Sequence, residues 1–344
     1  MLREDGVPVR RLQDPDPQTQ DGARQRASTE WAIEAEGLTK RFRHTTAVDG
    51  LELHIERGEI FGLLGPDGAG KSTTIRMLCA LIRPSAGTAR VAGYDVVKAS
   101  EALRQHIGYM AQQFSLYGDL TVEENLAFFA EVFGVGARER AQRTRALLEF
   151  ARLSAFRGRR AAHLSGGMQK KLALACTLIH QPEVIFLDEP TTGVDPLSRR
   201  EFWDLLTELH LEGVTLFVST PYMDEAERCS RVALMFGGRL MVCDTPERIK
   251  GLVEGELLEI RPERLREAAR LVAHLPGVRE VQTYGDLLHV FVDNAQRRAL
   301  DIRAVLERGQ ITVHGMRQTS PRMEEAFISL IRRRQGEAGH ASAD

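Results

Sequence analysis

The sequence predicts an α/β fold with a parallel-sheet core, followed by a small α+β domain. Short apolar runs at 59–65 (EIFGLLG), 184–190 (VIFLDEP) and 214–220 (VTLFVST) have the length and composition of buried strands. The last two follow helical stretches, which is the pattern of a parallel sheet covered by helices. A second series of strands and helices begins near residue 253 and has a different order.

The composition is that of a globular protein and excludes several function classes. Hydrophobic residues make up 43% and charged residues 27% of the 344 residues. The net charge of −2 argues against a nucleic-acid-coating protein, because binding to the phosphate backbone needs a basic excess. No apolar run reaches the roughly 18–20 residues that cross a bilayer, and the N-terminus lacks the apolar core of a secretory signal. We therefore expect an intracellular protein that serves any membrane from outside the lipid.

The first domain is expected to span residues 31–250. Residues 1–30 contain almost nothing that could be buried, so they are expected to form a disordered tail. Strand-like alternation begins at the start of the domain and recurs at 51–55. Helical periodicity covers 73–82, where a following proline bars continuation, and 121–157, where Glu and Arg recur at four-residue spacings.

The second domain is expected to span residues 253–334, with a loose tail over 335–344. Its apolar patterns follow the order strand, helix, strand, strand, helix, strand, helix. This order is typical of a small split-βαβ domain, and we expect its helices to cover one face of the sheet.

The residues GPDGAGKS at 65–72 form a phosphate-binding loop between a buried strand and a helix. Glycines let backbone N–H groups wrap a phosphate, and the helix N-terminus adds the positive end of its dipole. Lys71 is expected to reach the β- and γ-phosphates of a nucleotide, and Ser72 to ligate Mg²⁺. The predicted nucleotide-binding residues are Gly65, Pro66, Asp67, Gly68, Ala69, Gly70, Lys71, Ser72 and Thr73.

Two adjacent carboxylates end the apolar run at 184–190. In proteins with a phosphate-binding loop, the acid at this strand end holds Mg²⁺, usually through water, and here that residue is Asp188. Glu189 is then placed to polarise the attacking water as a general base.

The residues LSGGMQ at 164–169 resemble the LSGGQ signature of ATP-binding-cassette (ABC) ATPases, and they precede the carboxylate pair by the interval usual there. The resemblance extends over most of residues 32–250. It implies an ABC cassette with a parallel-sheet core, an antiparallel β subdomain and a helical subdomain at about 113–163. It also implies that Ser165, Gly166 and Gly167 complete the γ-phosphate pocket of an opposing subunit.

Further site residues follow from this resemblance. Gln112 lies in the segment similar to the family's Q-loop and would contact Mg²⁺, assist catalysis and sense the transport partner, although Gln113 is an alternative. Phe42 occupies the position of the aromatic residue that stacks on adenine; a core phenylalanine is the alternative. Asp195 lies in the segment similar to the D-loop, which meets the second subunit.

The sequence departs from the family at two positions. Met168 replaces the last residue of the signature, which leaves the phosphate-facing residues intact. Pro221 stands where family members carry a histidine that contacts the γ-phosphate, and proline supplies neither a side-chain nor a backbone donor. Slow hydrolysis is therefore expected, unless Tyr222 or Thr220 takes over the role.

The phrases EIFGLLGP, MDEAE and PRMEEAF resemble the ATPase subunits of drug and polysaccharide exporters. The resemblance implies an ATP- and Mg²⁺-dependent ATPase on the cytoplasmic, inner face of the plasma membrane. Its partners would be a separate integral-membrane permease and a second cassette, identical or different, with no nucleic acid. The alternative is a regulatory cassette that binds ATP with little turnover. A ribosome-bound ABC protein normally carries two phosphate-binding loops, and only one is visible in this sequence. A DNA-repair ATPase needs a long coiled coil before the signature, and the segment there has room only for a compact helical subdomain.

Overall fold

The computed structural model describes residues 31–113 and 116–341, so the predicted disordered tail over 1–30 lies outside the described residues. The chain divides into two compact units, Met1–Thr245 and Pro246–Asp344. The division falls shortly before residue 250, where the sequence places the end of the first domain. Each unit is described by itself.

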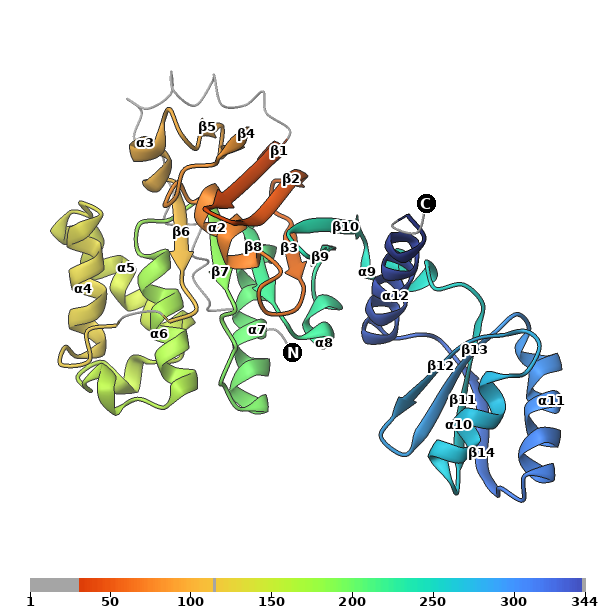
Figure 1. The fold of residues 1–344 in the computed structure, drawn as a ribbon. Coiled ribbons are helices and arrows are strands. Elements are labelled where there is room, and N and C mark those ends of the chain that lie inside the picture. The colour runs from red at the N-terminus through yellow and green to blue at the C-terminus, as the bar shows by residue number, and fades with distance from the viewer. Residues whose placement is uncertain (1–30, 114–115, 342–344) are drawn as a thin grey trace. The chain divides into compact units, whose positions relative to one another are not determined.

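The core of the first unit is a mostly parallel sheet with the strand order β10-β9-β3-β8-β7-β6 (Figure 1). Its strands are β3 (Ile60–Leu64), β6 (Ile107–Met110), β7 (Val184–Asp188), β8 (Thr215–Thr220), β9 (Arg231–Phe236) and β10 (Arg239–Asp244). Only β10 runs antiparallel to its neighbour. Every residue of β3, β7 and β8 is buried, as expected for strands covered on both faces. The predicted parallel-sheet core is therefore confirmed.

A second, antiparallel sheet has the order β2-β1-β4-β5. It consists of β1 (Trp31–Phe42), β2 (Thr45–Glu56), β4 (Ala86–Val91) and β5 (Tyr94–Asp95). The alternating burial along β2 shows that one of its faces contributes to the core. Ile33 and Leu53 of this sheet share one buried apolar cluster with Phe61 and Phe186 of the central sheet.

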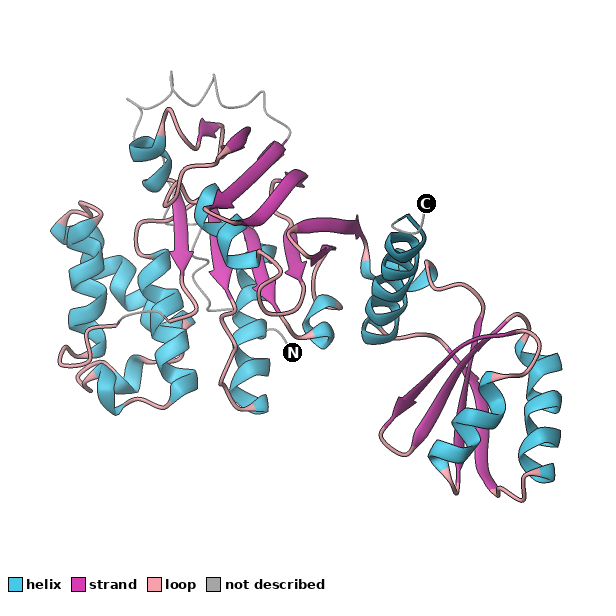
Figure 2. Ribbon diagram, in the orientation of Figure 1, coloured by secondary structure: helices cyan, strands magenta, loops and turns pink. Residues whose placement is uncertain are grey.

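Helices flank these sheets, and one group of helices lies to one side of the central sheet (Figure 2). That group contains α4 (Val122–Val132), α5 (Ala137–Phe150) and α6 (Gly166–Leu178), with short 3-10 helices at Ser154–Phe156 and Ala161–His163. The Thr121 and Glu124 side chains form a reciprocal cap that fixes the start of α4. The other helices in the described residues of this unit are α2 (Lys71–Leu78), α3 (Ser100–Arg104), α7 (Pro196–Leu211) and α8 (Met223–Ala226).

The second unit has the predicted order of strands and helices. After α9 (Pro246–Gly251) come β11 (Glu256–Pro262), α10 (Leu265–Ala273), β12 (Val278–Tyr284), β13 (Leu287–Val292), α11 (Ala295–Arg308), β14 (Val313–Thr319) and α12 (Met323–Ala341). The strands pair antiparallel in the order β12-β13-β11-β14. This is the split-βαβ arrangement that the sequence predicts.

The expectation that the helices share one face of this sheet is wrong for α12. Leu288, Val290 and Val292 alternate along β13 and join an apolar cluster with α10 and α11. His289 points to the other face, where its Nδ1 lies 2.8 Å from Glu325 Oε1 of α12. The helix order in the sequence could not decide the face, because both faces of an antiparallel sheet can be covered.

The expected loose tail is also corrected. Helix α12 continues to Ala341, so the backbone of residues 335–341 is helical, and residues 342–344 lie outside the described part of the chain. The small and polar residues there carry little burial signal, but they do not prevent continuation of a helix that is already formed. In the described residues, no helix combines the length and apolar character needed to cross a membrane.

Candidate functional site

The phosphate-binding loop joins β3 to α2 and is shaped by glycines with unusual backbone conformations. Gly68 and Gly70 have φ values of 76° and 108°, a region that side chains disfavour. A Cβ on Gly70 would lie 2.3 Å from the carbonyl oxygen of Ala47. No side chain caps the N-terminus of α2, so its first N–H groups are available to an anion.

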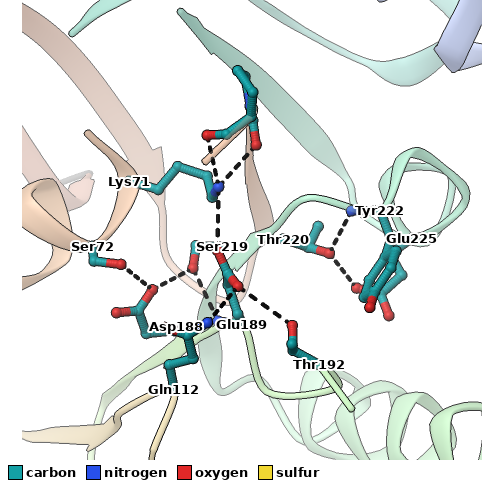
Figure 3. A network of polar contacts seen from close by, with 12 residues as sticks. Lys71, Ser72, Gln112, Asp188, Glu189, Thr192, Ser219, Thr220, Tyr222 and Glu225 are labelled. Atoms are coloured by element: carbon teal, nitrogen blue, oxygen red, sulfur yellow. Dashed lines mark hydrogen bonds and ion pairs between the residues drawn. The ribbon is translucent and has the colours of Figure 1, made fainter. Parts of the chain in front are cut away.

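Lys71 is held inside this loop by its own backbone. Its Nζ donates to the carbonyl oxygens of Gly65 at 2.8 Å and Pro66 at 3.2 Å. It also lies 3.2 Å from Glu189 Oε1, and both side chains are buried (Figure 3). A buried cation is therefore compensated by the carboxylate that the sequence assigns as general base.

Asp188 offers a free oxygen beside the loop. Its Oδ1 accepts hydrogen bonds from Ser72 Oγ at 3.0 Å and Ser219 Oγ at 2.7 Å. Its Oδ2 is buried and finds no hydrogen-bond partner within the described part of the chain. A buried carboxylate oxygen without a partner is costly, and a hydroxyl and a carboxylate are oxygen ligands of the kind Mg²⁺ takes. The residues present therefore fit a Mg²⁺ ion held jointly with phosphate oxygens.

Glu189 has a left-handed backbone, with φ of 48°, directly after β7. Its N–H donates to both the carbonyl oxygen and the Oγ of Ser219, which holds the strained conformation. Its carboxylate also accepts from Gln112 Nε2 at 2.9 Å and Thr192 Oγ1 at 3.4 Å. Glu189 is thus oriented from three sides.

Gln112 connects this carboxylate to the helical group. Its side-chain amide reaches Glu189, and its carbonyl oxygen accepts from Lys170 Nζ at 2.9 Å. Burial lowers the pKa of Lys170, whereas the negative charge of Glu189 acts in the opposite direction. Of the two candidate glutamines, Gln112 is the one whose side chain reaches Glu189.

These residues line a cavity of about 600 Å³. Its lining comprises Ala47, Asp67, Gly68, Gly70, Lys71, Ser72, Thr73, Gln112, Glu189, Thr192, Pro221 and Tyr222. The phosphate-binding loop, the predicted base and the position of the missing histidine therefore share one cavity. Asp188 contacts this lining through Ser72.

The signature residues lie outside this cavity. Ser165 caps α6 by accepting from the N–H of Met168, and a Cβ on Gly167 would lie 2.5 Å from Ser198 of α7. Asp195 caps α7 and accepts from the N–H of Ser198 at 2.9 Å, a hydrogen bond that lowers its pKa. Within one chain, the signature and Asp195 are built side by side but apart from the phosphate-binding loop.

Phe42 also stays outside the cavity lining. Its side chain is 47% exposed, and Lys40 Nζ lies 5.1 Å from the centre of its ring. Phe42 is the last residue of β1, and β1 and β2 form a hairpin. Ala47 in β2 is the residue of this hairpin that lines the cavity. The structure thus leaves the adenine-stacking role of Phe42 as a proposal.

Sequence reasoning missed several residues of the site. Ser219 and Thr192 hold Asp188 and Glu189, and Lys170 holds Gln112. The two polar residues Ser219 and Thr220 at the end of a buried strand were the available signal for Ser219. Lys170 carried no signal, because its partner lies on a distant segment.

The family described as ABC transporter matches residues 48–192. The probable multidrug ABC transporter ATP-binding protein YbhF of Escherichia coli is 48% identical over 221 residues, which are 64% of this chain and 38% of that protein. The daunorubicin resistance ATP-binding protein DrrA3 of Streptomyces coeruleorubidus is 37% identical over 305 residues, 87% of this chain and 95% of that protein.

Solved structures are similar over nearly two thirds of the chain. One is cbiO1 from Clostridium perfringens, described as part of an ABC transporter complex, with a TM-score of 0.61 and 28% identity over 65% of this chain and 92% of that chain. Another is a dimeric ATP-binding cassette in a post-hydrolysis state with ADP and Pi, with a TM-score of 0.57 and 26% identity over 62% of this chain and 98% of that chain.

Proposed function

The chain belongs to the ABC transporter family of ATP-binding proteins, and from this premise we propose that it binds and hydrolyses ATP to power a membrane exporter. The observation that carries the proposal is the cavity in which Lys71, Glu189 and the loop glycines converge. The exporter class is supported by relatives named for multidrug transport, daunorubicin resistance and Nod factor export.

The charges of the site support phosphoryl chemistry. The N-terminus of α2 and Lys71 attract phosphate groups, while Ser72 and Asp188 supply oxygens for Mg²⁺. A Mg²⁺ ion held there would neutralise charge that develops on the phosphates. When Lys71 pairs with a phosphate instead of with Glu189, the carboxylate loses its cationic partner. Glu189 can then accept a proton from water. Gln112 and Thr192 keep its carboxylate oriented.

The separation of the signature from the cavity supports a dimeric mechanism. Ser165, Gly166 and Asp195 do not line the cavity of their own chain. We propose that they face the ATP of a second cassette, as the head-to-tail arrangement of the family implies, and that closure and reopening of the dimer drives a separate permease. The protein would then act at the cytoplasmic face of the plasma membrane.

A degenerate cassette is the second candidate, and Pro221 is the observation that favours it. Pro221 lines the cavity but provides no hydrogen-bond donor there. In this case the chain binds ATP at its own loop with little turnover and serves a partner cassette through its intact signature.

ATP titration of the purified protein tests the common part of both candidates. We expect Lys71→Ala to weaken MgATP binding by about 2 kcal/mol, roughly 30-fold, because a charge-assisted contact to phosphate is lost. Lys98→Ala, at an exposed position, is the control and should bind like the parent. Parental affinity in Lys71→Ala would rule out this nucleotide site.

A further inference from the structure

Glu225 is a buried carboxylate next to the candidate site, and neither the motifs nor the proposed reaction assign it a role. It lies in α8 and is 1% exposed. Its Oε1 accepts from Thr191 Oγ1 at 2.6 Å. Its Oε2 accepts from Thr220 Oγ1, also at 2.6 Å (Figure 3). Arg199 Nε lies 3.7 Å from Oε1 and compensates part of its charge.

The two threonines belong to segments that both reach the nucleotide cavity. Thr191 lies between the base Glu189 and the D-loop segment that ends at Asp195. Thr220 is the last residue of β8 and directly precedes Pro221, which lines the cavity. Glu225 therefore joins the segment that follows the base to the segment that carries the missing histidine position.

The hydrogen bonds also determine whether the Thr220 hydroxyl can donate to a bound phosphate. Its hydroxyl has one proton, which it donates to Glu225, and its oxygen accepts from the N–H of Tyr222 at 3.1 Å. Thr220 therefore has no donor left for a γ-phosphate. Because Pro221 has no N–H, the hydrogen bonds at Thr220 and Tyr222 anchor the chain on either side of it.

We propose that Glu225 is a positioning residue that holds the Thr220–Tyr222 segment against the nucleotide cavity and couples it to the D-loop through Thr191. The inference rests on the proposed function. Both threonine hydroxyls donate to this one carboxylate, so it fixes the direction in which each hydroxyl points. Movement of Thr191, whose segment leads toward a second cassette, is then transmitted to Pro221.

The first test is hydrogen exchange of the Tyr222 amide in the full chain without nucleotide. In Glu225→Gln, one oxygen becomes an NH₂ group that cannot accept from a threonine, so exchange at Tyr222 should accelerate at least about 10-fold. Thr191→Val should also accelerate it, although Thr191 does not touch Tyr222. Asp224→Asn is the matched control, because Asp224 is a neighbour on α8, contacts the same Arg199, and has a side chain that is 65% exposed.

The second test separates positioning from binding. In Glu225→Gln, the Kd for MgATP should stay within about twofold of the parental value, because the loop that binds phosphate is untouched. The kcat should fall about 10-fold, because the Thr220–Tyr222 segment is no longer held in position. A gain in rate from Pro221→His should disappear when Glu225→Gln is added and persist with Asp224→Asn.

Unchanged Tyr222 exchange in both Glu225→Gln and Thr191→Val would overturn the inference. The same holds if Pro221→His raises the rate equally with and without Glu225→Gln. Failure of the proposed function would give a different result, because the parental chain would then bind no MgATP. The hydrogen-exchange experiment needs no nucleotide and would still report on Glu225.

Discussion

At the scale of single residues, Glu189 shows how the site is prepared for substrate. Its carboxylate is shared by Lys71, Gln112 and Thr192, and its backbone adopts a conformation that costs on the order of 1–3 kcal/mol. The surrounding fold must maintain this strain. The benefit is a carboxylate that is already held in place in the cavity lining before any nucleotide binds.

Glu189→Gln is expected to bind ATP but not to turn it over. The amide keeps the shape and the hydrogen bond to Thr192, but it cannot accept a proton from water. Hydrolysis should fall by about 10²-fold or more in a phosphate-release assay, with Kd for MgATP within a few-fold of the parental value. Hydrolysis at the parental rate would show that Glu189 is not the base.

Pro221→His is expected to raise the ATPase rate by about 10²–10³-fold, because a donor would again point at charge that develops on the γ-phosphate. Pro221→Ala is the control, since it removes the ring without adding a donor. The assay should use the protein with its permease. An unchanged or lower rate, from a parental protein that is already a strong ATPase, would show that the site is not degenerate.

At the scale of elements, a partly buried histidine lies at the contact between the helical group and the central sheet. His180 follows α6, stacks on Phe133 at a centroid distance of 3.7 Å, and its Nε2 donates to the carbonyl oxygen of Ile107 in β6. Its Nδ1 is buried without a hydrogen-bond partner in the part of the chain that the structure describes. Burial lowers the pKa of His180 to about 4, and the nearby charge of Arg143 acts in the same direction.

Acid is therefore expected to weaken this joint. Above about pH 6.5 the histidine is neutral in both the folded and the unfolded chain, so its contribution to stability is complete. As the pH falls from 6.5 toward 4, this histidine becomes protonated in the unfolded chain but stays neutral in the folded chain. The free energy of unfolding therefore decreases. His180→Gln keeps a side-chain N–H donor but does not titrate.

The measurement is the free energy of unfolding of both proteins at pH 7.5 and pH 5. The parental protein should lose about 1 kcal/mol more than His180→Gln over this interval. Equal losses in the two proteins would show that His180 does not carry this pH dependence.

At the scale of the whole molecule, the cassette carries two half-sites that do not meet within one chain. The phosphate-binding loop and Glu189 line the cavity, whereas Ser165, Gly166 and Asp195 lie elsewhere. A complete site then requires two chains, and the proposed head-to-tail dimer supplies it.

Complementation between two inactive variants tests this arrangement. Lys71→Ala removes the ammonium group of the phosphate-binding loop. Gly166→Asp places a negative charge in the signature, where a Cβ meets open space. Each variant alone should be inactive. A mixed dimer contains one intact loop facing one intact signature, so mixing should restore activity to about a quarter of the reference rate, which is best measured in the Pro221→His background. No restoration would contradict a site shared between two copies of this chain.

Much of the fold and part of the site are determined by the sequence itself. Buried strands, the phosphate-binding loop at 65–72, the Asp188–Glu189 pair and the order of elements in the second unit all follow from local spacing and periodicity. These features are local because a strand, a tight glycine turn or an amphipathic helix is specified by residues within a few positions of one another.

Only the tertiary structure decided which distant side chains meet. Ser72 and Asp188 are 116 positions apart, yet they share a hydrogen bond, because β3 and β7 run parallel with β8 between them and end at one edge of the sheet. The same applies to the contact of Glu225 with Thr191, and to the face of the second sheet that α12 covers. Such contacts depend on how elements pack, and hydrophobic periodicity within one element carries no information about its neighbour.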